Sequence, residues 1–440
     1  FADDALTQAS TYATLARVNR SSGEIDTGRY RWNWRPRATT NPDDWSALTN
    51  LIAVVNDTLA PDYEGRVRTW MDVANFLRPV AVHHICGSWD SYAYDRGKNM
   101  YAYKPDTEPW RLLMWDIELA LGAGGNAPSD SIYRMFDQTL LRMITNTPSF
   151  HREYLRAFQE ALDSPLQPGA ADPLLDERYA SFLQNNVPMV SPQFIKNFIA
   201  ARRNYLLTVI PSATFSVNNP AYQAVSGTNL LTLTGSAPLS VEHIFVNGIP
   251  YPVTWTGTTT WRVLAPLAAG TNFLTVTATD RKGNPIPNAS FNLTANYTGA
   301  AVAPEGHVVF SEILPQPVAG GAQFVELFNT HSNFAFDLSG WSINGLAYVF
   351  PPGSTIPPRG FRVLCSDPFA FSQTYGLTNV PFGAFDGRLD EDGETLTLLR
   401  PGAGTNQIVV DRVRYEAATP WPAATNGISL QLVEIGRAHV

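Results

Sequence analysis

The chain has 440 residues, which is more than one hydrophobic core usually serves, so its length predicts two to four domains. Hydrophobic residues make up 44% of the chain and charged residues 16%, a balance that argues against disorder over most of its length. The net charge is -8 and no block of basic residues occurs, which disfavours DNA or RNA as a partner. No run of about 18 apolar residues occurs, so no membrane span is expected in this chain.

Neither end of the sequence is expected to be a natural terminus. The chain begins with Phe1 and shows no signal peptide, so we expect the natural N-terminus to lie upstream. Residues 434–440 resemble one translated frame of a sequencing adapter, and we interpret them as an artefact. Cys86 and Cys365 fall in segments assigned to different domains, which excludes an intradomain disulfide and predicts two buried apolar residues.

Apolar residues recur at helical spacing through most of residues 1–210. A helix that begins near Asp72 contains Pro79, which is expected to kink it or to mark its first turn. The other expected helices cover residues 42–57, about 130–145, 149–163, 173–186 and 192–209. The sequence therefore predicts a mostly helical first region.

Within this helical region, residues 99–104 and 110–115 are rich in strand-forming side chains and enclose a turn at residues 105–109. The turn is five residues long and contains two prolines. This arrangement predicts a single antiparallel β-hairpin.

The periodicity changes at Pro211, where short strands begin to alternate with turn signals. Residues 211–298 predict a β-sandwich of immunoglobulin size, with Trp255, Trp261 and Leu274 as inward-facing bulk. Residues 299–305 are small and predict a flexible linker, and residues 306–433 predict a second all-β module.

The second β module contains five ordered motifs, at residues 311–314, 324–329, 337–341, 392–398 and 411–415. This set resembles the lamin tail domain, an immunoglobulin-like sandwich, over nearly the whole module. Sandwiches of this kind usually serve as binding or spacer modules, so the resemblance implies an attachment role.

The same motifs predict which side chains fill the core of this module. Val325, Leu327, Leu338 and Trp341 are expected to be buried. Glu312 and Glu326 are expected to satisfy backbone donors or to pair with arginines, a structural role that we favour over catalysis.

In the helical region, Asp90, Asn99 and Asp116 provide the groups that phosphoryl transfer requires. That chemistry needs a carboxylate near the acceptor hydroxyl, and an amide oxygen and a second carboxylate on Mg²⁺. The strands of a hairpin run antiparallel, so Asn99 before the first strand and Asp116 after the second are expected at the same open end. Asp90, nine residues before Asn99, is close enough in sequence to reach that end.

This stretch resembles the CotH-type atypical kinases, which phosphorylate proteins. The matching features are Trp89-Asp90, the strand around Lys98-Asn99-Met100-Tyr101, and Trp115-Asp116-Ile117-Glu118 before Gly122. The resemblance implies Asp90 as the catalytic carboxylate, Asn99 and Asp116 as nucleotide- and metal-binding residues, and Glu118 as a further metal ligand. It also implies ATP and Mg²⁺ as cofactors and a protein as the phosphate acceptor.

The resemblance covers residues 40–207 and corresponds to the C-terminal lobe of such kinases. No Gly-rich phosphate loop or phosphate-pairing lysine strand precedes Asp90, so we expect the nucleotide lobe upstream of Phe1 and an inactive fragment. Glu118 stands where the family often has a second Asp, which keeps the charge but lengthens the side chain.

Each of these residues also has a structural interpretation. Asp90 can cap the segment after Trp89, and Asp116 with Glu118 can form a pair that faces solvent. His83 and His84 are adjacent in a helix and point in different directions, so they predict core or surface positions and a poor metal pair. Arg202-Arg203 is explained by the dipole at the end of the last helix.

The sequence thus predicts a multidomain protein: an α+β kinase-like C-terminal lobe, mostly helical with one β-hairpin, and two all-β sandwich modules. The leading functional hypothesis is an extracytoplasmic protein kinase that transfers phosphate from ATP to Ser or Thr and is attached by its β modules to a surface or protein ligand. The alternative is a non-catalytic adhesion or binding protein with a kinase-like scaffold. A glycoside hydrolase that uses Asp116 and another carboxylate ranks last.

Overall fold

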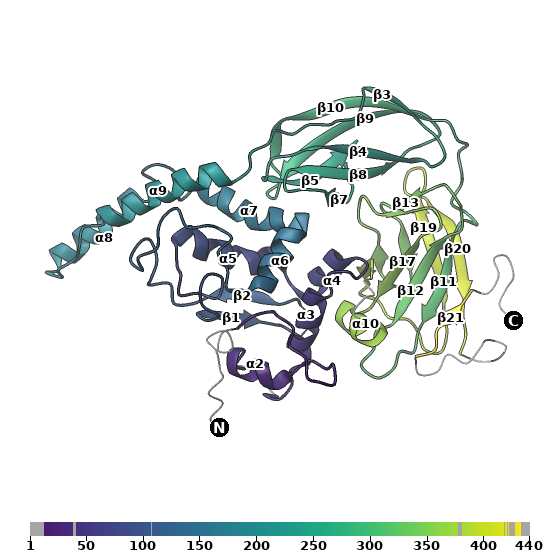
Figure 1. Cartoon of the computed structure of the whole chain (residues 1–440). Coiled ribbons are helices and arrows are strands. Elements are labelled where there is room, and N and C mark those ends of the chain that lie inside the picture. Colours follow the sequence, from purple (N-terminus) through teal and green to yellow (C-terminus); the bar gives the residue numbers. More distant parts are fainter. Residues whose placement is uncertain are drawn as a thin grey trace. The chain divides into compact units, whose positions relative to one another are not determined.

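The computed structural model describes residues 13–37, 41–106, 108–376, 381–417, 419, 421 and 427–432. Their contacts form two compact units that divide after Ala213, with Thr256–Thr259 counted in the first unit. The first unit is mostly helical and the second is built from β-sheets (Figure 1). This confirms the predicted fold class, whereas the predicted domain boundaries stay predictions.

In the first unit, helices precede and follow a two-stranded ribbon along the chain. The ribbon consists of β1 (Met100–Tyr103) and β2 (Arg111–Met114), which pair antiparallel as predicted. The helices are α2 (Thr27–Asn33), α3 (Ser46–Asn56), α4 (Tyr63–Trp70), α5 (Val73–Cys86), α6 (Gln138–Asn146), α7 (Pro148–Asp163), α8 (Asp172–Gln184) and α9 (Gln193–Val209).

Helix α5 is the core helix of this unit because it packs against both α7 and β2. Asp72 caps its first turn by accepting the N–H of Asn75 at 3.0 Å, and Gly87 ends it with φ 65°, a conformation that favours glycine. The buried side chains of α5 include Phe76 and Val80. Pro79 lies in the helix interior, so of the two predicted alternatives the first-turn position is wrong and the kink stays a prediction.

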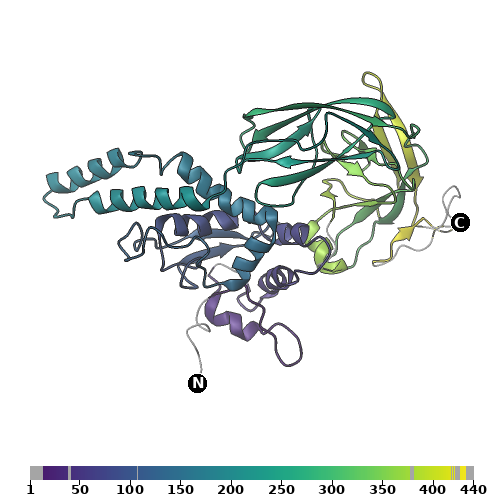
Figure 2. The ribbon, with the colours of Figure 1, turned by 45° about the horizontal axis from the view of Figure 1, so that its top comes forward.

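Helices α8 and α9 lie side by side as a projecting pair within the first unit (Figures 1 and 2). The Lys196 ammonium on α9 lies 2.8 Å from the Asp176 carboxylate on α8 and links the two helices. None of the residues of α8 is buried. The pair is therefore held mainly by partly exposed contacts.

The helix predicted at about 130–145 is shorter in the structure, because α6 begins only at Gln138. Asp137 caps it by accepting the N–H groups of Thr139 and Leu140 at 3.0 and 3.1 Å. The residues that precede Asp137 form turns, and their carbonyl groups are bound by side chains from other helices. The apolar spacing alone did not reveal this capping position.

The second unit begins with a sandwich of two sheets, in the strand orders β3-β10-β9-β5-β6 and β4-β8-β7. Trp261 and Leu274 are buried between them as predicted, and Trp255 is partly buried against the same core. The strands are β3 (Tyr222–Val225), β4 (Leu230–Ser236), β5 (Val241–Val246), β6 (Ile249–Pro250), β7 (Val253–Trp255), β8 (Thr260–Pro266), β9 (Gly270–Asp280) and β10 (Pro285–Tyr297).

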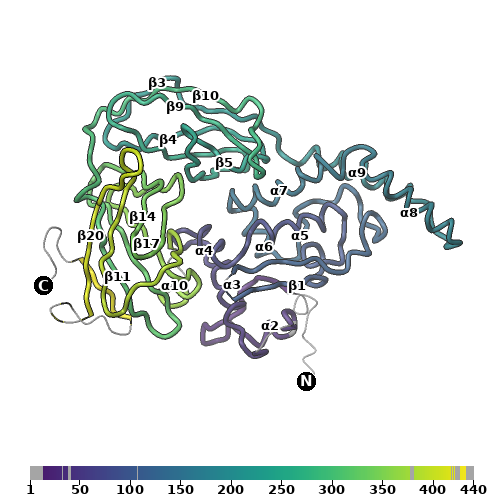
Figure 3. Tube along the Cα trace, turned by 180° about the vertical axis from the view of Figure 1, so that it is seen from behind, coloured from purple at the N-terminus to yellow at the C-terminus, as the bar shows by residue number. Residues whose placement is uncertain are grey.

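The second sandwich pairs the sheet β18-β17-β12-β11-β21 with the sheet β15-β14-β19-β20, and Figure 3 shows its trace from behind. The four predicted core residues, Val325, Leu327, Leu338 and Trp341, are all buried. Its elements are β11 (Val308–Leu314), β12 (Phe324–Asn329), β13 (Phe336–Asp337), β14 (Ser342–Asn344), β15 (Tyr348–Val349), β16 (Thr355–Ile356), β17 (Phe361–Cys365), α10 (Pro368–Tyr375), β18 (Gly383–Ala384), β19 (Thr395–Pro401), β20 (Gln407–Arg414) and β21 (Leu430–Gln431).

The two sandwiches share one apolar core cluster and are joined by polar contacts. The buried Asn229 side chain accepts the N–H of Ala335 at 2.7 Å and donates to its carbonyl at 3.0 Å. The predicted linker also makes contacts of its own, since Glu305 pairs with Arg400 at 2.7 Å. These contacts hold the second unit together as one body.

Several smaller expectations are settled by the structure. Among the described residues, no helix is both long and apolar enough to cross a membrane. Cys86 and Cys365 are both free thiols; Cys365 is buried as predicted, whereas Cys86 is only partly buried, so the prediction for Cys86 is wrong. The interpretation of residues 434–440 as an artefact falls outside the described residues.

Candidate functional site

Asp90 and Asn99 lie in direct contact at the open end of the β1–β2 ribbon. The Asn99 side-chain amide donates to the Asp90 backbone carbonyl at 2.7 Å and to its carboxylate at 3.3 Å. The same carboxylate oxygen lies 3.0 Å from the Lys98 ammonium. The Asp90 side chain is 14% exposed, so one edge of this contact remains open to a ligand.

The ribbon explains why these residues meet. Met100 pairs with Met114, so Asn99 and Asp116 both lie just beyond the last pair, at the same end. Leu112 is buried on the side that packs against α5, and its N–H donates to the side chain of Asn75 at 3.3 Å. The packing of β2 on α5 therefore anchors the ribbon whose open end carries the site residues.

Two of the site residues have left-handed backbone conformations, with φ 56° at Asn99 and 58° at Asp116. Non-glycine residues adopt such conformations rarely, and Asn and Asp do so at the lowest cost. Backbone strain of this kind clusters at functional sites. Its presence on both sides of the ribbon end supports a site there.

Asp116 and Glu118 are both exposed, and among the described residues no hydrogen bond or ion pair joins either of them to Asp90 or Asn99. The structure thus brings Asp90 and Asn99 together and places Asp116 at the same ribbon end without a direct bond. No group of three His, Cys, Asp or Glu side chains suited to a metal occurs in the described part of the chain. The metal roles of Asn99, Asp116 and Glu118 stay predictions, although their oxygen-only donor set fits Mg²⁺.

The outer face of the ribbon carries large exposed side chains next to this site. Tyr101 is 40% exposed, Leu113 50% and Trp115 58%. The rings of Tyr101 and Trp115 meet edge to face with centroids 5.4 Å apart. An exposed aromatic surface beside polar groups is typical of a binding site.

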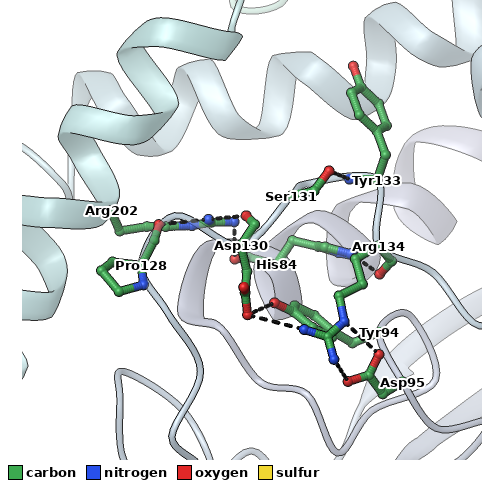
Figure 4. A network of polar contacts seen from close by, with 9 residues as sticks. All are labelled: His84, Tyr94, Asp95, Pro128, Asp130, Ser131, Tyr133, Arg134 and Arg202. Atoms are coloured by element: carbon green, nitrogen blue, oxygen red, sulfur yellow. Dashed lines mark hydrogen bonds and ion pairs between the residues drawn. The ribbon is translucent and has the colours of Figure 1, made fainter.

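A buried arginine of α9 ties the loop before α6 to the last turn of α5, the helix that precedes Asp90 (Figure 4). Arg202 of α9 is 1% exposed and donates to the carbonyl groups of His84, Pro128 and Asp130 at 2.5 to 2.9 Å. Arg202 lies in the middle of α9, and no basic residue occupies the last turn of that helix. The prediction that the helix dipole explains Arg202-Arg203 is therefore wrong.

His84 lies beneath the same loop and is completely buried. Its ring nitrogens face the carbonyl oxygens of Val80 and Arg134 at 2.9 and 3.0 Å, and a neutral ring donates to only one of them. Burial lowers the pKa of His84 to about 4, and burial also lowers the pKa of His83 to about 4. Both histidines are core residues, which is one of the two predicted positions.

The segment that follows Asp90 is fastened to this loop by charged side chains. Arg134 holds the Asp95 carboxylate at 2.6 Å, and the Tyr94 hydroxyl donates to Asp130 at 2.9 Å (Figure 4). Burial, reinforced by the neighbouring Asp130 carboxylate, raises the pKa of Tyr94. Because Tyr94 and Asp95 lie only a few residues beyond Asp90, these bonds help to set the position of its carboxylate.

Two protein families match this sequence. The family described as "CotH kinase protein" matches residues 7–206, and the "Lamin Tail Domain" family matches residues 301–417. The chain joins a CotH kinase region to a lamin tail domain. The CotH match begins well before residue 40, where the sequence resemblance starts, and it includes Asp90, Asn99, Asp116 and Glu118.

The search of curated proteins gives no match. Among solved structures, the "D00-D0 domain of Intimin" is 12% identical over 46% of this chain and 99% of that chain, with a TM-score of 0.14. A Bacteroides ovatus SGBP-B, solved in complex with a mixed-linkage heptasaccharide, is 13% identical over 46% of this chain and 47% of that chain, with a TM-score of 0.15. Scores this low carry no argument about fold or function.

The structure adds residues to the CotH region that the sequence did not single out for a role. In the sequence Lys98 is only one member of a motif, whereas in the structure its ammonium lies 3.0 Å from the Asp90 carboxylate. Asp137 is 1% exposed, and its carboxylate accepts the Leu15 N–H at 2.7 Å and the Tyr92 hydroxyl at 2.8 Å. No sequence pattern identifies such long-range partners.

In the lamin tail domain, Glu312 and Glu326 lie directly opposite each other on β11 and β12. Glu326 accepts the Ser311 hydroxyl at 2.8 Å, and Glu312 accepts the Ser429 hydroxyl. Burial and the nearby Glu312 carboxylate raise the pKa of Glu326. Glu312 and Glu326 thus have a structural role, but their partners are serine hydroxyls and not the arginines or backbone donors that were predicted.

Proposed function

We propose that the CotH kinase region transfers the terminal phosphate of ATP to a serine or threonine hydroxyl of a protein acceptor. The observation that carries this proposal is the contact of Asp90 with Asn99 and Lys98, at the same ribbon end as Asp116. Phosphoryl transfer is catalysed mainly by positioning and charge, and these groups supply both. The family description, which names a kinase, supports the same reaction.

In this proposal, the Asp90 carboxylate accepts the proton of the acceptor hydroxyl, because it is the partly exposed carboxylate that its neighbours hold in place. Asn99 and Asp116 would hold Mg²⁺, with Glu118 as a further ligand. When bound, Mg²⁺ would neutralise charge on the nucleotide phosphates. The exposed Tyr101 and Trp115 rings beside the site offer an aromatic surface to the nucleotide base.

The β modules act as attachment or binding modules for a surface or protein ligand, and the protein works outside the cytoplasm. The shared core of the two sandwiches supports a rigid attachment body. Both statements rest on the type of module that accompanies the CotH region.

The test is a thermal-shift titration of the full-length gene product with ATP and Mg²⁺, together with phosphate transfer to a protein acceptor. Asp116→Ala is expected to abolish the Mg²⁺-dependent shift and to lower transfer by at least about a hundredfold. The matched control is Asp106→Ala, which removes the same charge from an exposed position in the turn at the opposite end of the hairpin. Wild-type nucleotide binding by Asp116→Ala would end the metal-ligand assignment.

The second candidate is a binding protein with a kinase-like scaffold and no turnover. The observation that favours it is that Asp116 and Glu118 are exposed and, among the described residues, share no hydrogen bond or ion pair with Asp90 or Lys98. A full-length protein that binds no nucleotide and transfers no phosphate, while its unfolding remains cooperative, would support this candidate.

A further inference from the structure

One face of the first sandwich is unusually uniform in its chemistry. Along β9 the buried side chains alternate with outward ones, and the outward positions carry four threonines and Phe273. The outward positions of the central part of β10 carry Ser290, Asn292, Thr294 and Asn296. We call this outward surface of β3, β10 and β9 the Thr/Asn face.

Two aromatic side chains stand in one row across the Thr/Asn face. Thr294 of β10 pairs with Tyr222 of β3 on one side and with Phe273 of β9 on the other. Tyr222 is 59% exposed and Phe273 is 78% exposed. Two strand spacings separate them, about 10 Å, which is comparable to two sugar units of an extended polysaccharide.

The polar side chains between the aromatic ones are held in place by cross-strand hydrogen bonds. The Thr275 hydroxyl donates to the Asn292 side-chain oxygen at 2.8 Å, and Thr271 donates to Asn296 at 3.4 Å. In both asparagines this leaves the amide N–H groups for a ligand. Donors that are fixed before binding lose little side-chain entropy when they bind.

The outward positions of these three strands, residues 222–224, 271–279 and 290–296, carry no charged side chain. A nucleic acid needs lysines or arginines to neutralise its phosphates, and an anionic membrane surface attracts basic residues in the same way. A ligand that matches this face is therefore uncharged. It also presents many hydroxyl groups and has flat apolar patches that can lie on aromatic rings.

We propose that the Thr/Asn face is a binding platform for an extended, neutral polysaccharide. Tyr222 and Phe273 contact the C–H faces of alternate sugar rings, and the asparagine and threonine side chains hydrogen-bond to the sugar hydroxyls. This role is independent of the phosphoryl-transfer proposal, because the face lies on a different unit from the ribbon site. It specifies the class of ligand that the β modules would bind in the proposed attachment role.

The test is a depletion binding isotherm of the full chain on insoluble cellulose and chitin, with pectate as an acidic polysaccharide. We expect binding to at least one neutral polysaccharide and none to pectate. The double variant Tyr222→Ala/Phe273→Ala is expected to weaken binding by about tenfold or more. Both side chains are largely exposed, so the variant is expected to unfold at the wild-type temperature.

The matched control is Leu264→Ala, which removes a 42% exposed side chain from β8 in the opposite sheet and is expected to bind like the wild type. Equal binding by the double variant and the wild type would overturn the proposal, as would the absence of binding to every neutral polysaccharide. A concentration-dependent dimer that the double variant loses would assign the face to a second copy of the chain and would also overturn it.

Discussion

The helical unit and the β unit differ in the polar side chains that they bury. In the helical unit, buried charged side chains bind the backbone of loops, as Arg202 does for three carbonyl groups and Asp137 for three N–H groups. In the β unit, one apolar cluster extends through both sandwiches, and strand pairing satisfies most of the backbone. Both units bury apolar side chains, such as Phe76 and Leu77 in the helical unit, so the difference lies in the directional bonds that buried charged side chains add to the helical unit.

This difference has consequences for function. Directional bonds can hold the segment after Asp90 in one position, which a catalytic carboxylate requires. The sandwich, with its apolar core, supports a broad, flat surface such as the Thr/Asn face. The two units are therefore expected to respond to different perturbations, one to the loss of polar groups and to acid, the other to the loss of volume.

The largest effect is expected from Trp261→Ala in the β unit. Trp261 is 1% exposed, stacks on Phe215 at 5.7 Å and donates to the Ser236 carbonyl at 2.9 Å. Truncation removes this volume and one of the two donors to that carbonyl, which keeps the Ser216 N–H at 2.9 Å, so the β unit should lose about 4 kcal/mol of unfolding free energy. Urea unfolding followed by near-UV circular dichroism measures the loss.

The control for this prediction is Phe273→Ala, which removes an aromatic ring from the surface of the same sandwich. Its unfolding free energy should remain within about 0.5 kcal/mol of the wild type. Equal destabilisation by the two variants would contradict the idea that packed volume holds the β unit together.

In the helical unit, Arg202→Ala is expected to cost about 3 kcal/mol, because three carbonyl groups lose a charged donor inside the protein. Arg178→Ala on α8 removes the same charge from an exposed position and should change little. Urea unfolding followed by far-UV circular dichroism reports on the helices. A small effect of Arg202→Ala would show that the loop is held by other contacts.

This contrast also explains how much could be predicted from the sequence. Strand alternation identified Val325, Leu327, Leu338 and Trp341 as core residues, because burial follows directly from spacing. Hairpin pairing likewise placed Asn99 and Asp116 at one end of the ribbon. The partners of Arg202 lie up to 118 residues away in the chain, and no local pattern encodes such contacts. The ion pair of Lys98 with Asp90 and the left-handed backbone of Asn99 lie in an irregular segment that no spacing rule predicts.

Acid is expected to destabilise the helical unit in particular. Burial lowers the pKa values of His83 and His84 to about 4, below the usual value of 6.5. Their contribution to stability is therefore complete above pH 6.5 and is lost as the pH falls toward 4, on the order of 2 kcal/mol per histidine at pH 5. Unfolding free energies at pH 7.5 and pH 5 measure this loss.

A substitution can separate the two histidines. Among the described residues, the ring nitrogens of His83 have no hydrogen-bond partner, so His83→Leu should leave stability at pH 7.5 nearly unchanged and reduce the acid loss by about half. His84→Leu should destabilise at both pH values, because its ring nitrogens lie against carbonyl groups. An undiminished acid loss in His83→Leu would mean that other groups cause it.

The smallest effect concerns Asn99, whose φ of 56° carries a steric cost for any side chain with a Cβ atom that lacks compensating bonds. Asn99→Gly and Asn99→Ala both remove the amide that donates to Asp90, so both should lose phosphate transfer if that amide positions the carboxylate. Only the alanine variant also bears the backbone strain, and it should be about 1 kcal/mol less stable than the glycine variant. If the two variants were equally stable, the backbone at residue 99 would relax at little cost. The positive φ of Asn99 would then not indicate a site that the fold holds in place.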